Sequence, residues 1–260
     1  MTTGASDFWD SASQAERVAR AYGAPDIVRV RAALLDLLAP EPGWRVLDLG
    51  AGPGVFAVAL ADRGCRPTLV DFAPSMLEHA RGRLGERADA YVVADAARVD
   101  LPDAAFDAAC VVQVLEYVDD PVAVLREAAR LVRPGGVVLA SDTDWDTMAF
   151  AIEDVELGRR VTAAHAATKP DPWAGRRMRG WLVAAGLEPH AHRIEVLHSD
   201  HRDGDTFIEH NWPHFRRLLE RRELVPAAEL DRFERQVDAA EAAGAYGFAV
   251  MRHAWRAGRR

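Results

Sequence analysis

The sequence predicts an α/β fold in which helices cover both faces of a mostly parallel β-sheet. Between residues 45 and 141, short runs rich in valine and leucine alternate with helical stretches, and strands separated by helices are typical of parallel sheets. A glycine-rich turn, Gly50-Ala51-Gly52-Pro53-Gly54, follows the first run and precedes a helix. The length of 260 residues suits one α/β domain with an elaboration, or two small domains.

Two helices are expected before the sheet. Apolar residues in Ser6–Tyr22 recur at intervals of four and three, so they share one helix face. A second helix follows Pro25, and the segment Pro40-Glu41-Pro42-Gly43 ends it.

The alternating part of the chain comes next. Its predicted strands are Arg45–Leu49, Arg66–Asp71, Ala90–Ala94, Phe106–Val112 and Val137–Ser141. Its predicted helices are Val55–Arg63, Pro74–Leu84 and Pro121–Leu131. Pro74 falls in the first turn of its helix, where a missing N–H costs little.

The pattern loosens after Ser141. Helices are expected near 150–161 and at Gly175–Ala185, Thr206–Arg222 and Pro226–Ala243, and strands at Glu188–Leu197 and Tyr246–Trp255. Residues 198–245 would then form a helical insertion between the last two strands. An insertion beside the carboxyl ends of the strands is a natural cap over a site.

Composition and charge narrow the class of function. The formal net charge of −8 argues against nucleic acid as the main partner. The longest apolar runs, such as Val137–Ala140, are strand-sized, and the N-terminus shows no secretion signal, so we expect no membrane association and a cytoplasmic location. Cys65 and Cys110 form no metal or redox motif, and no zinc-type Cys/His spacing appears, so no metal site is expected.

The glycine-rich turn is the strongest local signal. Its glycines allow a sharp turn and a close approach of the backbone to a ligand, beside the free N–H groups of a helix N-terminus. The turn departs from the nicotinamide and flavin fingerprint G-x-G-x-x-G, because Val55 stands where the third glycine should be. No G-K-[ST] follows, so a P-loop is excluded.

Polar side chains follow the later strands. Asp71 ends the second strand, where a carboxylate can accept hydrogen bonds from two ribose hydroxyls; the alternative is a cap for the helix that begins at Pro74. Asp95 follows the third strand and Gln113 the fourth. All of them fall at the carboxyl ends of predicted parallel strands, where open α/β sheets bind ligands.

Five segments together carry a family resemblance: Asp48–Gly54, Leu69–Asp71, Ala94–Ala96, Phe106–Pro121 and Leu131–Ala140. In them the chain resembles a class I S-adenosylmethionine-dependent methyltransferase of the small-molecule group related to the ubiquinone and menaquinone C-methyltransferases. The resemblance covers residues 26–142 well and 172–197 loosely. It implies a Rossmann-like fold with a seven-stranded sheet, and S-adenosylmethionine as the cofactor.

The resemblance also implies which residues would hold the nucleoside of the cofactor. Asp71 would bind the ribose hydroxyls, and Phe72 and Met76 would flank the adenine. Asp95 would accept a hydrogen bond from the adenine amino group, with the Ala96 N–H beside it.

The methionine part of the cofactor would lie over Gly50, Ala51 and Gly52, with Asp48 ordering the loop. Gln113 would lie near the sulfonium. Tyr22 and Arg31, from the N-terminal helices, would close over the cofactor carboxylate; the alternative is a tyrosine at the core edge and a solvated arginine.

Methyl transfer from a sulfonium is an in-line displacement, which needs mainly aligned reactants and exclusion of water. A base is required only where the acceptor is protonated. Asp144, after the fifth strand, and His198 and His201, in the histidine-rich region 190–214, are the candidates. The alternatives are helix-capping loop residues and solvated or core histidines.

We therefore expect methyl transfer to a small-molecule acceptor, such as a natural-product intermediate. The alternative is a methyltransferase-fold enzyme that catalyses a cyclisation, hydroxylation or decarboxylation, with the cofactor as an aid or absent. The expected organisation is a helical cap (1–25), a cofactor-binding core (26–197), a helical insertion over the substrate (198–245), and a final strand with a tail (246–260). No residue pattern argues for an oligomer.

Overall fold

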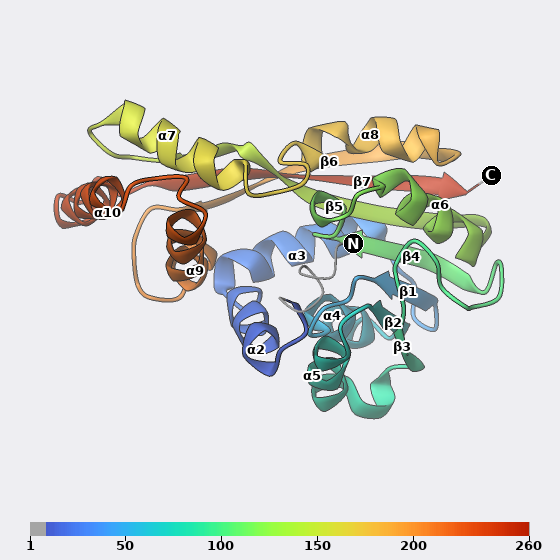
Figure 1. Ribbon diagram of the computed structural model, residues 1–260. Helices are drawn as coiled ribbons and strands as arrows, with labels where there is room; N and C mark the ends of the chain where they lie inside the picture. The colour runs from blue at the N-terminus through green and yellow to red at the C-terminus, as the bar shows by residue number, and fades with distance from the viewer. Residues whose placement is uncertain (1–8, 260) are drawn as a thin grey trace.

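The computed structural model describes residues 9–259, and its centre is a seven-stranded sheet (Figure 1). The strands are β1 Arg45–Leu49, β2 Arg66–Asp71, β3 Ala90–Val93, β4 Phe106–Val112, β5 Val132–Phe150, β6 Leu187–Ser199 and β7 Phe248–Arg259. They lie in the order β3-β2-β1-β4-β5-β7-β6. The first five strands are parallel, whereas β7 runs antiparallel to both β5 and β6. The predicted mostly parallel α/β sheet is therefore confirmed.

The helices fall close to the predicted segments. They are α2 Ala12–Ala21, α3 Pro25–Leu38, α4 Val55–Asp62, α5 Pro74–Leu84, α6 Pro121–Leu131, α7 Val155–Ala166, α8 Ala174–Ala184, α9 Phe207–Arg221 and α10 Ala227–Ala242, with the short 3-10 turns η1 Gly85–Arg87 and η2 Leu115–Tyr117. The helix predicted from residue 6 instead begins at Ala12, because the Ser11 side chain accepts a hydrogen bond from the Gln14 N–H as its N-cap. Residues 6–8 of that prediction lie outside the described part of the chain. No helix within residues 9–259 is both long and apolar enough to cross a bilayer.

Side chains along β5 show that helices cover both faces of the sheet. Val138 and Ala140 pack into the core that contains α6 and α8, whereas Val137 and Leu139 pack against α3. Successive residues of a strand point to opposite faces, so these two sets belong to two helical layers. Figure 1 shows α8 and α3 on opposite sides of β5, β6 and β7.

One expectation of the sequence is wrong: β5 does not end at Ser141 but continues to Phe150. The polar run after Ser141, expected to follow the strand, is buried and paired with distant groups. Asp142 accepts a hydrogen bond from the Leu115 N–H at 3.0 Å, and the Thr143 hydroxyl donates to Gln113 Oε1 at 2.7 Å. The strand β5 stays paired with the antiparallel strand β7 as far as Phe150, which lies opposite Phe248. These backbone partners come from a distant part of the chain, so the local sequence does not reveal the continuation of β5. The next helix accordingly begins only at Val155.

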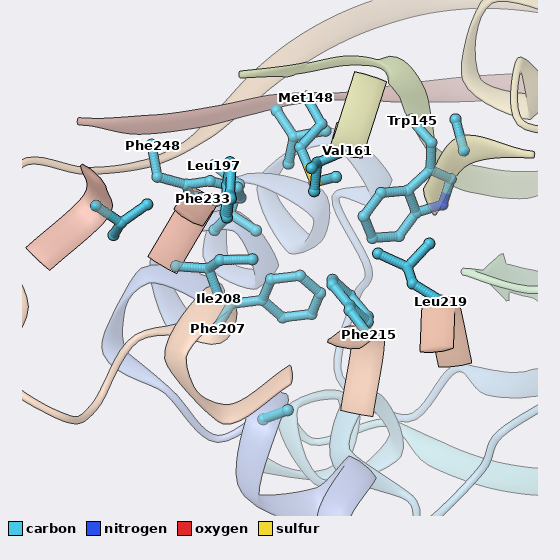
Figure 2. Close-up of a cluster of buried hydrophobic side chains, with 14 of the residues drawn as sticks. Trp145, Met148, Val161, Leu197, Phe207, Ile208, Phe215, Leu219, Phe233 and Phe248 are labelled. Carbon is cyan, nitrogen blue, oxygen red and sulfur yellow. The ribbon is translucent and has the colours of Figure 1, made fainter. Parts of the chain in front are cut away.

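The insertion between β6 and β7 consists of α9 and α10, as predicted. It packs its apolar faces against the far ends of β5 and β7 in the core cluster of Figure 2, where Trp145, Phe207 and Phe215 are buried. Full burial of each such side chain contributes roughly 1.5–3 kcal/mol. The same helix α9 lies beside α2 (Figure 1), where Arg17 Nη1 donates to Asn211 Oδ1 at 2.6 Å. The insertion is thus fixed to both the sheet and the N-terminal helices.

Candidate functional site

A cavity of about 1220 Å³ extends from the carboxyl ends of β1, β2 and β4 to helix α9. The strand β1 pairs with β2 on one side and with β4 on the other, so the connections diverge here, as at the ligand-binding crevices of open α/β sheets. A pocket for one small ligand usually measures about 300–1,000 Å³, so this cavity has room for two molecules.

The cavity has two parts of different origin. We call the first the strand half; its lining residues follow the strands, and they are Asp48, Gly50, Ala51, Gly52, Pro53, Asp71, Phe72, Met76, Ala94, Ala96, Val112, Gln113 and Val114. We call the second the helix half; it is lined from α2, η2, the segment 167–170 and α9, together with Trp145.

The glycine turn forms the floor of the strand half. Gly50 and Gly52 have φ of +72° and +53°, a left-handed region that favours glycine. A Cβ atom on Gly50 would lie 2.4 Å from Val114 Cγ2, so this position admits no side chain without displacing the wall. A Cβ on Gly52 would meet nothing within 4 Å, so its backbone is open on that side.

Asp71 joins this turn to the end of β2. Its two carboxylate oxygens accept hydrogen bonds from the Gly52 N–H at 2.8 Å and the Ala73 N–H at 3.0 Å. Burial raises the pKa of Asp71, and the hydrogen bonds from Ala73, Gly52 and Phe72 counteract that rise. Asp71 does not cap the first turn of α5, because the Ser75 N–H of that turn donates to Asp10 Oδ1 at 2.9 Å. A carboxylate has about four lone-pair sites, so Asp71 can still accept a hydrogen bond from a ligand.

Asp48 is the other carboxyl group that lines the strand half. It is 2% exposed, and its Oδ2 has no hydrogen-bond partner among the described residues. Burial, together with the charge of Asp71, raises the pKa of Asp48 to about 7. No hydrogen bond within residues 9–259 joins the Asp48 side chain to the glycine turn; the turn instead donates to the Asp71 carboxylate from Gly52 and to the Val70 carbonyl from Gly50 and Ala51.

Among the residues expected to hold the adenine, Phe72, Met76 and Ala96 line the cavity. Asp95 does not: it is exposed, and its carboxylate accepts a hydrogen bond from the Ala97 N–H at 2.9 Å. This local turn directs the side chain away from the lining residues on either side of it.

Gln113 and Tyr22 line the cavity, and Arg31 does not. Gln113 has a φ of +59°, and its N–H donates to the Ser141 carbonyl at 2.7 Å, which fixes the end of β4 in the strand half. Arg31 instead donates to the carbonyl oxygens of Tyr22 and Val55 at 3.4 and 3.3 Å. Its guanidinium thus bridges α3 to the backbone of neighbouring segments.

The helix half is an aromatic chamber with several cations. Trp145, Phe207 and Phe215 supply its apolar wall, and Figure 2 shows the Trp145 and Phe215 rings on the same side of the cluster as Leu219. The Trp145 Nε1–H donates to the buried carboxylate of Glu116 at 2.7 Å, which sets the orientation of the indole. The cationic side chains that line this half are Arg17, Lys169, Arg221 and Arg222.

The three candidate bases of the sequence lie outside the cavity lining. Asp144 is buried and forms a two-pronged ion pair with Arg176 of α8, with one bond of 2.8 Å. His198 is exposed on β6, and His201 is exposed between Asp200 and Asp203. Asp144 points to α8 because successive side chains of a strand alternate between the two faces of the sheet.

A different histidine lines the helix half. Burial, together with the charges of Arg17 and Lys169, lowers the pKa of His214 to about 4, so its imidazole is neutral at pH 7. Sequence reasoning missed His214 and the four cations. The available signal was helical spacing: the lining residues of α9 and its end recur at i, i+3, i+4, i+7, i+10 and i+11, namely Asn211, His214, Phe215, Leu218, Arg221 and Arg222.

Comparison with known proteins agrees with this geometry. Residues 47–140 match the family model described as "Methyltransferase domain". The chain is 38% identical over 144 residues to malonyl-[acyl-carrier protein] O-methyltransferase of Serratia marcescens, covering 54% of this chain and 56% of the relative. It is 35% identical over 131 residues to ubiquinone biosynthesis O-methyltransferase of Paracidovorax citrulli, covering 49% of this chain and 55% of the relative. The chain therefore spans about half the length of these curated relatives.

Among solved structures, phosphoethanolamine N-methyltransferase 2 of Haemonchus contortus, in complex with S-adenosyl-L-methionine, superposes with a TM-score of 0.62. The sequence identity is 17%, over 98% of this chain and 59% of that protein, so this likeness concerns the fold. Residues 47–140 therefore form a methyltransferase domain, and the sheet has the Rossmann-like fold of class I methyltransferases, as the resemblance in sequence predicts.

Proposed function

We propose that this protein binds S-adenosylmethionine in the strand half of the cavity and transfers its methyl group to a small-molecule acceptor in the helix half. The observation that carries the proposal is the continuity of one cavity from the glycine turn and Asp71 to the aromatic chamber around Trp145 and Phe215. A bimolecular transfer needs both reactants held next to each other, and one continuous cavity permits this.

The residues of the strand half fit such a cofactor. The open backbone of Gly52 permits close approach, and Asp71 has lone pairs left for ribose hydroxyls. The unpartnered buried Oδ2 of Asp48 is an acceptor that a cationic ligand would satisfy, which matters because a buried polar atom without a partner costs about 1–3 kcal/mol. Phe72 and Met76 offer apolar surface for a base.

The cofactor supplies an electrophilic methyl group on a sulfonium. The protein's own contribution is alignment and exclusion of water. Gln113, held by Ser141 and Thr143, forms part of the wall of the strand half. Tyr22 lies against Phe207 with ring centroids 5.8 Å apart, and both rings line the cavity. His214, neutral at pH 7, lines the helix half and can form a hydrogen bond with a hydroxyl or amine of the methyl acceptor.

The first test is calorimetric titration of the protein with S-adenosylmethionine and with S-adenosylhomocysteine. We expect micromolar binding of both at one site per chain, followed by methyl transfer in a screen of small-molecule acceptors that includes natural-product intermediates. Failure of folded protein to bind either compound would overturn the proposal. It would favour a methyltransferase-fold enzyme of another reaction, such as a cyclisation, hydroxylation or decarboxylation.

A further inference from the structure

We propose that the acceptor is an amphipathic anion, with an apolar body in the aromatic chamber and a carboxylate or phosphate group held by Lys169, Arg17 and Arg222. This inference rests on the proposed function, and it adds the chemical class of the substrate.

The three cations reach the helix half from separate parts of the chain. Arg17 comes from α2, Lys169 from the segment after α7, and Arg222 from the end of α9. Their mutual proximity is visible in their electrostatics: burial lowers the pKa of Lys169, the Glu116 carboxylate raises it, and the charges of Arg17 and Arg222 lower it again. Like charges placed together disfavour one another, and an anionic ligand would relieve that repulsion.

Lys169 is the buried member of the group. Its side chain is only 9% exposed, and its Nζ lies 4.6 and 4.9 Å from the ring centroids of Tyr117 and Trp145. One of its three donors is used by the Tyr117 hydroxyl at 2.9 Å, and the nearest carboxylate oxygen, on Glu116, is 4.0 Å away. Donors therefore remain for a ligand, in surroundings where a charge-assisted hydrogen bond is strong.

The arginines are not neutralised by carboxylates. Within residues 9–259, no carboxylate oxygen lies within 4.0 Å of Arg17 or Arg222; Arg17 donates to side-chain amide oxygens of Gln14 and Asn211, and Arg222 to the Thr168 carbonyl. The described acidic residues that line the cavity, Asp48 and Asp71, both belong to the strand half. The lining of the cavity therefore carries acidic groups at one end and cations at the other, and the carboxylate nearest to the cations, Glu116, lies behind the lining, 4.0 Å from Lys169.

The surroundings of these cations are apolar and aromatic. Phe207, Phe215 and Leu218 line the same half, with Trp145 and Tyr117 beside Lys169. A fully polar anion would leave this surface wet, whereas a ligand with an apolar body would cover it. The two features together select an amphipathic acid.

The test uses two fluorescent probes with the same ring system: 8-anilinonaphthalene-1-sulfonate, which is anionic, and N-phenyl-1-naphthylamine, which is neutral. Both are titrated at low salt with S-adenosylhomocysteine at saturation, so that the strand half is filled. The double variant Lys169→Gln/Arg222→Gln should bind the anionic probe about tenfold to hundredfold more weakly and the neutral probe as before. Arg222→Lys, which keeps the charge, should retain most of the affinity.

A matched control is Arg179→Gln/Arg235→Gln, which removes the same two charges from exposed positions on α8 and α10 outside the cavity lining. It should bind both probes like the wild type. Equal affinity for the anionic probe in all variants would overturn the inference, and unchanged affinity for S-adenosylhomocysteine would then leave the proposed function standing. A loss of S-adenosylhomocysteine affinity with unchanged probe binding would also overturn it, because the cations would then serve the cofactor.

Displacement of the bound anionic probe then identifies the head group. Decanoate, decyl phosphate and decanol share an apolar chain and differ in charge. Stronger displacement by decanoate or by decyl phosphate than by decanol supports the inference and distinguishes a carboxylate from a phosphate. Displacement by decanol as strong as that by both anions contradicts it.

Discussion

The strand half and the helix half of the cavity are built in different ways. In the strand half the hydrogen bonds of Asp71 span 2 positions to Ala73 and 19 to Gly52, and they follow from where parallel strands end. In the helix half the contacts are longer in sequence: Arg17 bonds Asn211 across 194 positions, and Lys169 meets Tyr117 across 52. The first half can therefore be recognised from a local motif, whereas the second exists only when distant helices are packed together.

The two halves also differ in how far their residues can be substituted without disturbing the fold. Residues of the strand half are part of strand ends and tight turns, so substituting them disturbs the sheet. The cations of the helix half line the cavity from α2, α9 and the segment 167–170 and are not members of the hydrophobic core cluster, so they can be exchanged while that core remains. The acceptor side of such a site can therefore differ between proteins that share one fold.

The largest effect is expected from Gly50→Ala in the strand half. The new Cβ would lie 2.4 Å from Val114 Cγ2 at a φ of +72°, so overpacking and left-handed strain together should lower the free energy of unfolding by roughly 2–5 kcal/mol. Binding of S-adenosylhomocysteine should fall below detection by calorimetry. Gly180→Ala is the control, because a Cβ there meets nothing within 4 Å and alanine favours a helix. Wild-type affinity of Gly50→Ala would show that the turn does not hold the cofactor.

The next effect is a pH dependence carried by Asp48. Its pKa in the folded protein is raised to about 7, so its stabilising contribution is present below the unfolded pKa near 3.8 and is lost as the pH rises through 7. Asp48→Asn should therefore be more stable than the wild type at pH 8, by at most about 4 kcal/mol, and equal to it near pH 4. Thermal unfolding at pH 4, 6 and 8 measures this difference.

The same ionisation should strengthen binding of a cation. S-adenosylmethionine carries a sulfonium charge that S-adenosylhomocysteine lacks, so its affinity should rise more steeply between pH 6 and pH 8. In Asp48→Asn the two slopes should be equal. Equal slopes in the wild type would show that Asp48 does not sense the charge of the cofactor.

Asp71→Ala should weaken cofactor binding less than Gly50→Ala does. This variant tests whether Asp71 binds the ligand or only orders the glycine turn. We expect affinity for S-adenosylhomocysteine to fall by about 1–3 kcal/mol, the range for a lost charge-assisted hydrogen bond. Asp95→Ala is the matched control, because that carboxylate is exposed and bonded to Ala97. If Asp71→Ala lowers the melting temperature but binds with wild-type affinity, Asp71 only orders the turn through Gly52. If Asp95→Ala weakens binding as much as Asp71→Ala, Asp95 contacts the adenine as the family resemblance implies, although it lies outside the cavity lining in this structure.

The sequence predicts those parts of the fold that depend on local patterns, and it fails where contacts between distant segments decide the structure. The sheet from β1 to β4 and the glycine turn are predictable because period-two and helical patterns, with glycine at forced backbone positions, act locally. The continuation of β5 through Asp142 and Asp144 is not, because these acids become buried only through Leu115 and Arg176, which the local pattern does not contain.

The candidate bases show the limit most clearly. The cluster of histidines in 190–214 is a true feature of the sequence, but clustering along the chain does not bring side chains to one place. His198 lies on the exposed edge of β6, while His214 is turned into the cavity by its place on α9. To predict that His214 and not His198 lines the cavity, one would need to know how α9 packs against α2, and that packing depends on tertiary structure.

The smallest effects are expected from His198→Ala and His201→Ala. His201 is exposed, and its hydrogen bond to Asp200 raises its pKa, so its ion pair contributes only below the folded pKa and disappears as the pH rises through it. Exposed pairs contribute little, so the melting temperature should change slightly at pH 6 and not at pH 9. Neither variant should alter cofactor affinity or the rate of methyl transfer.

His214→Ala should slow methyl transfer and leave affinity for S-adenosylhomocysteine intact, because the His214 ring lines the helix half and not the strand half. A reversed result, with His201→Ala slow and His214→Ala unaffected, would mean that the segment after β6 closes over the cavity during turnover and that α9 serves only to shape its wall.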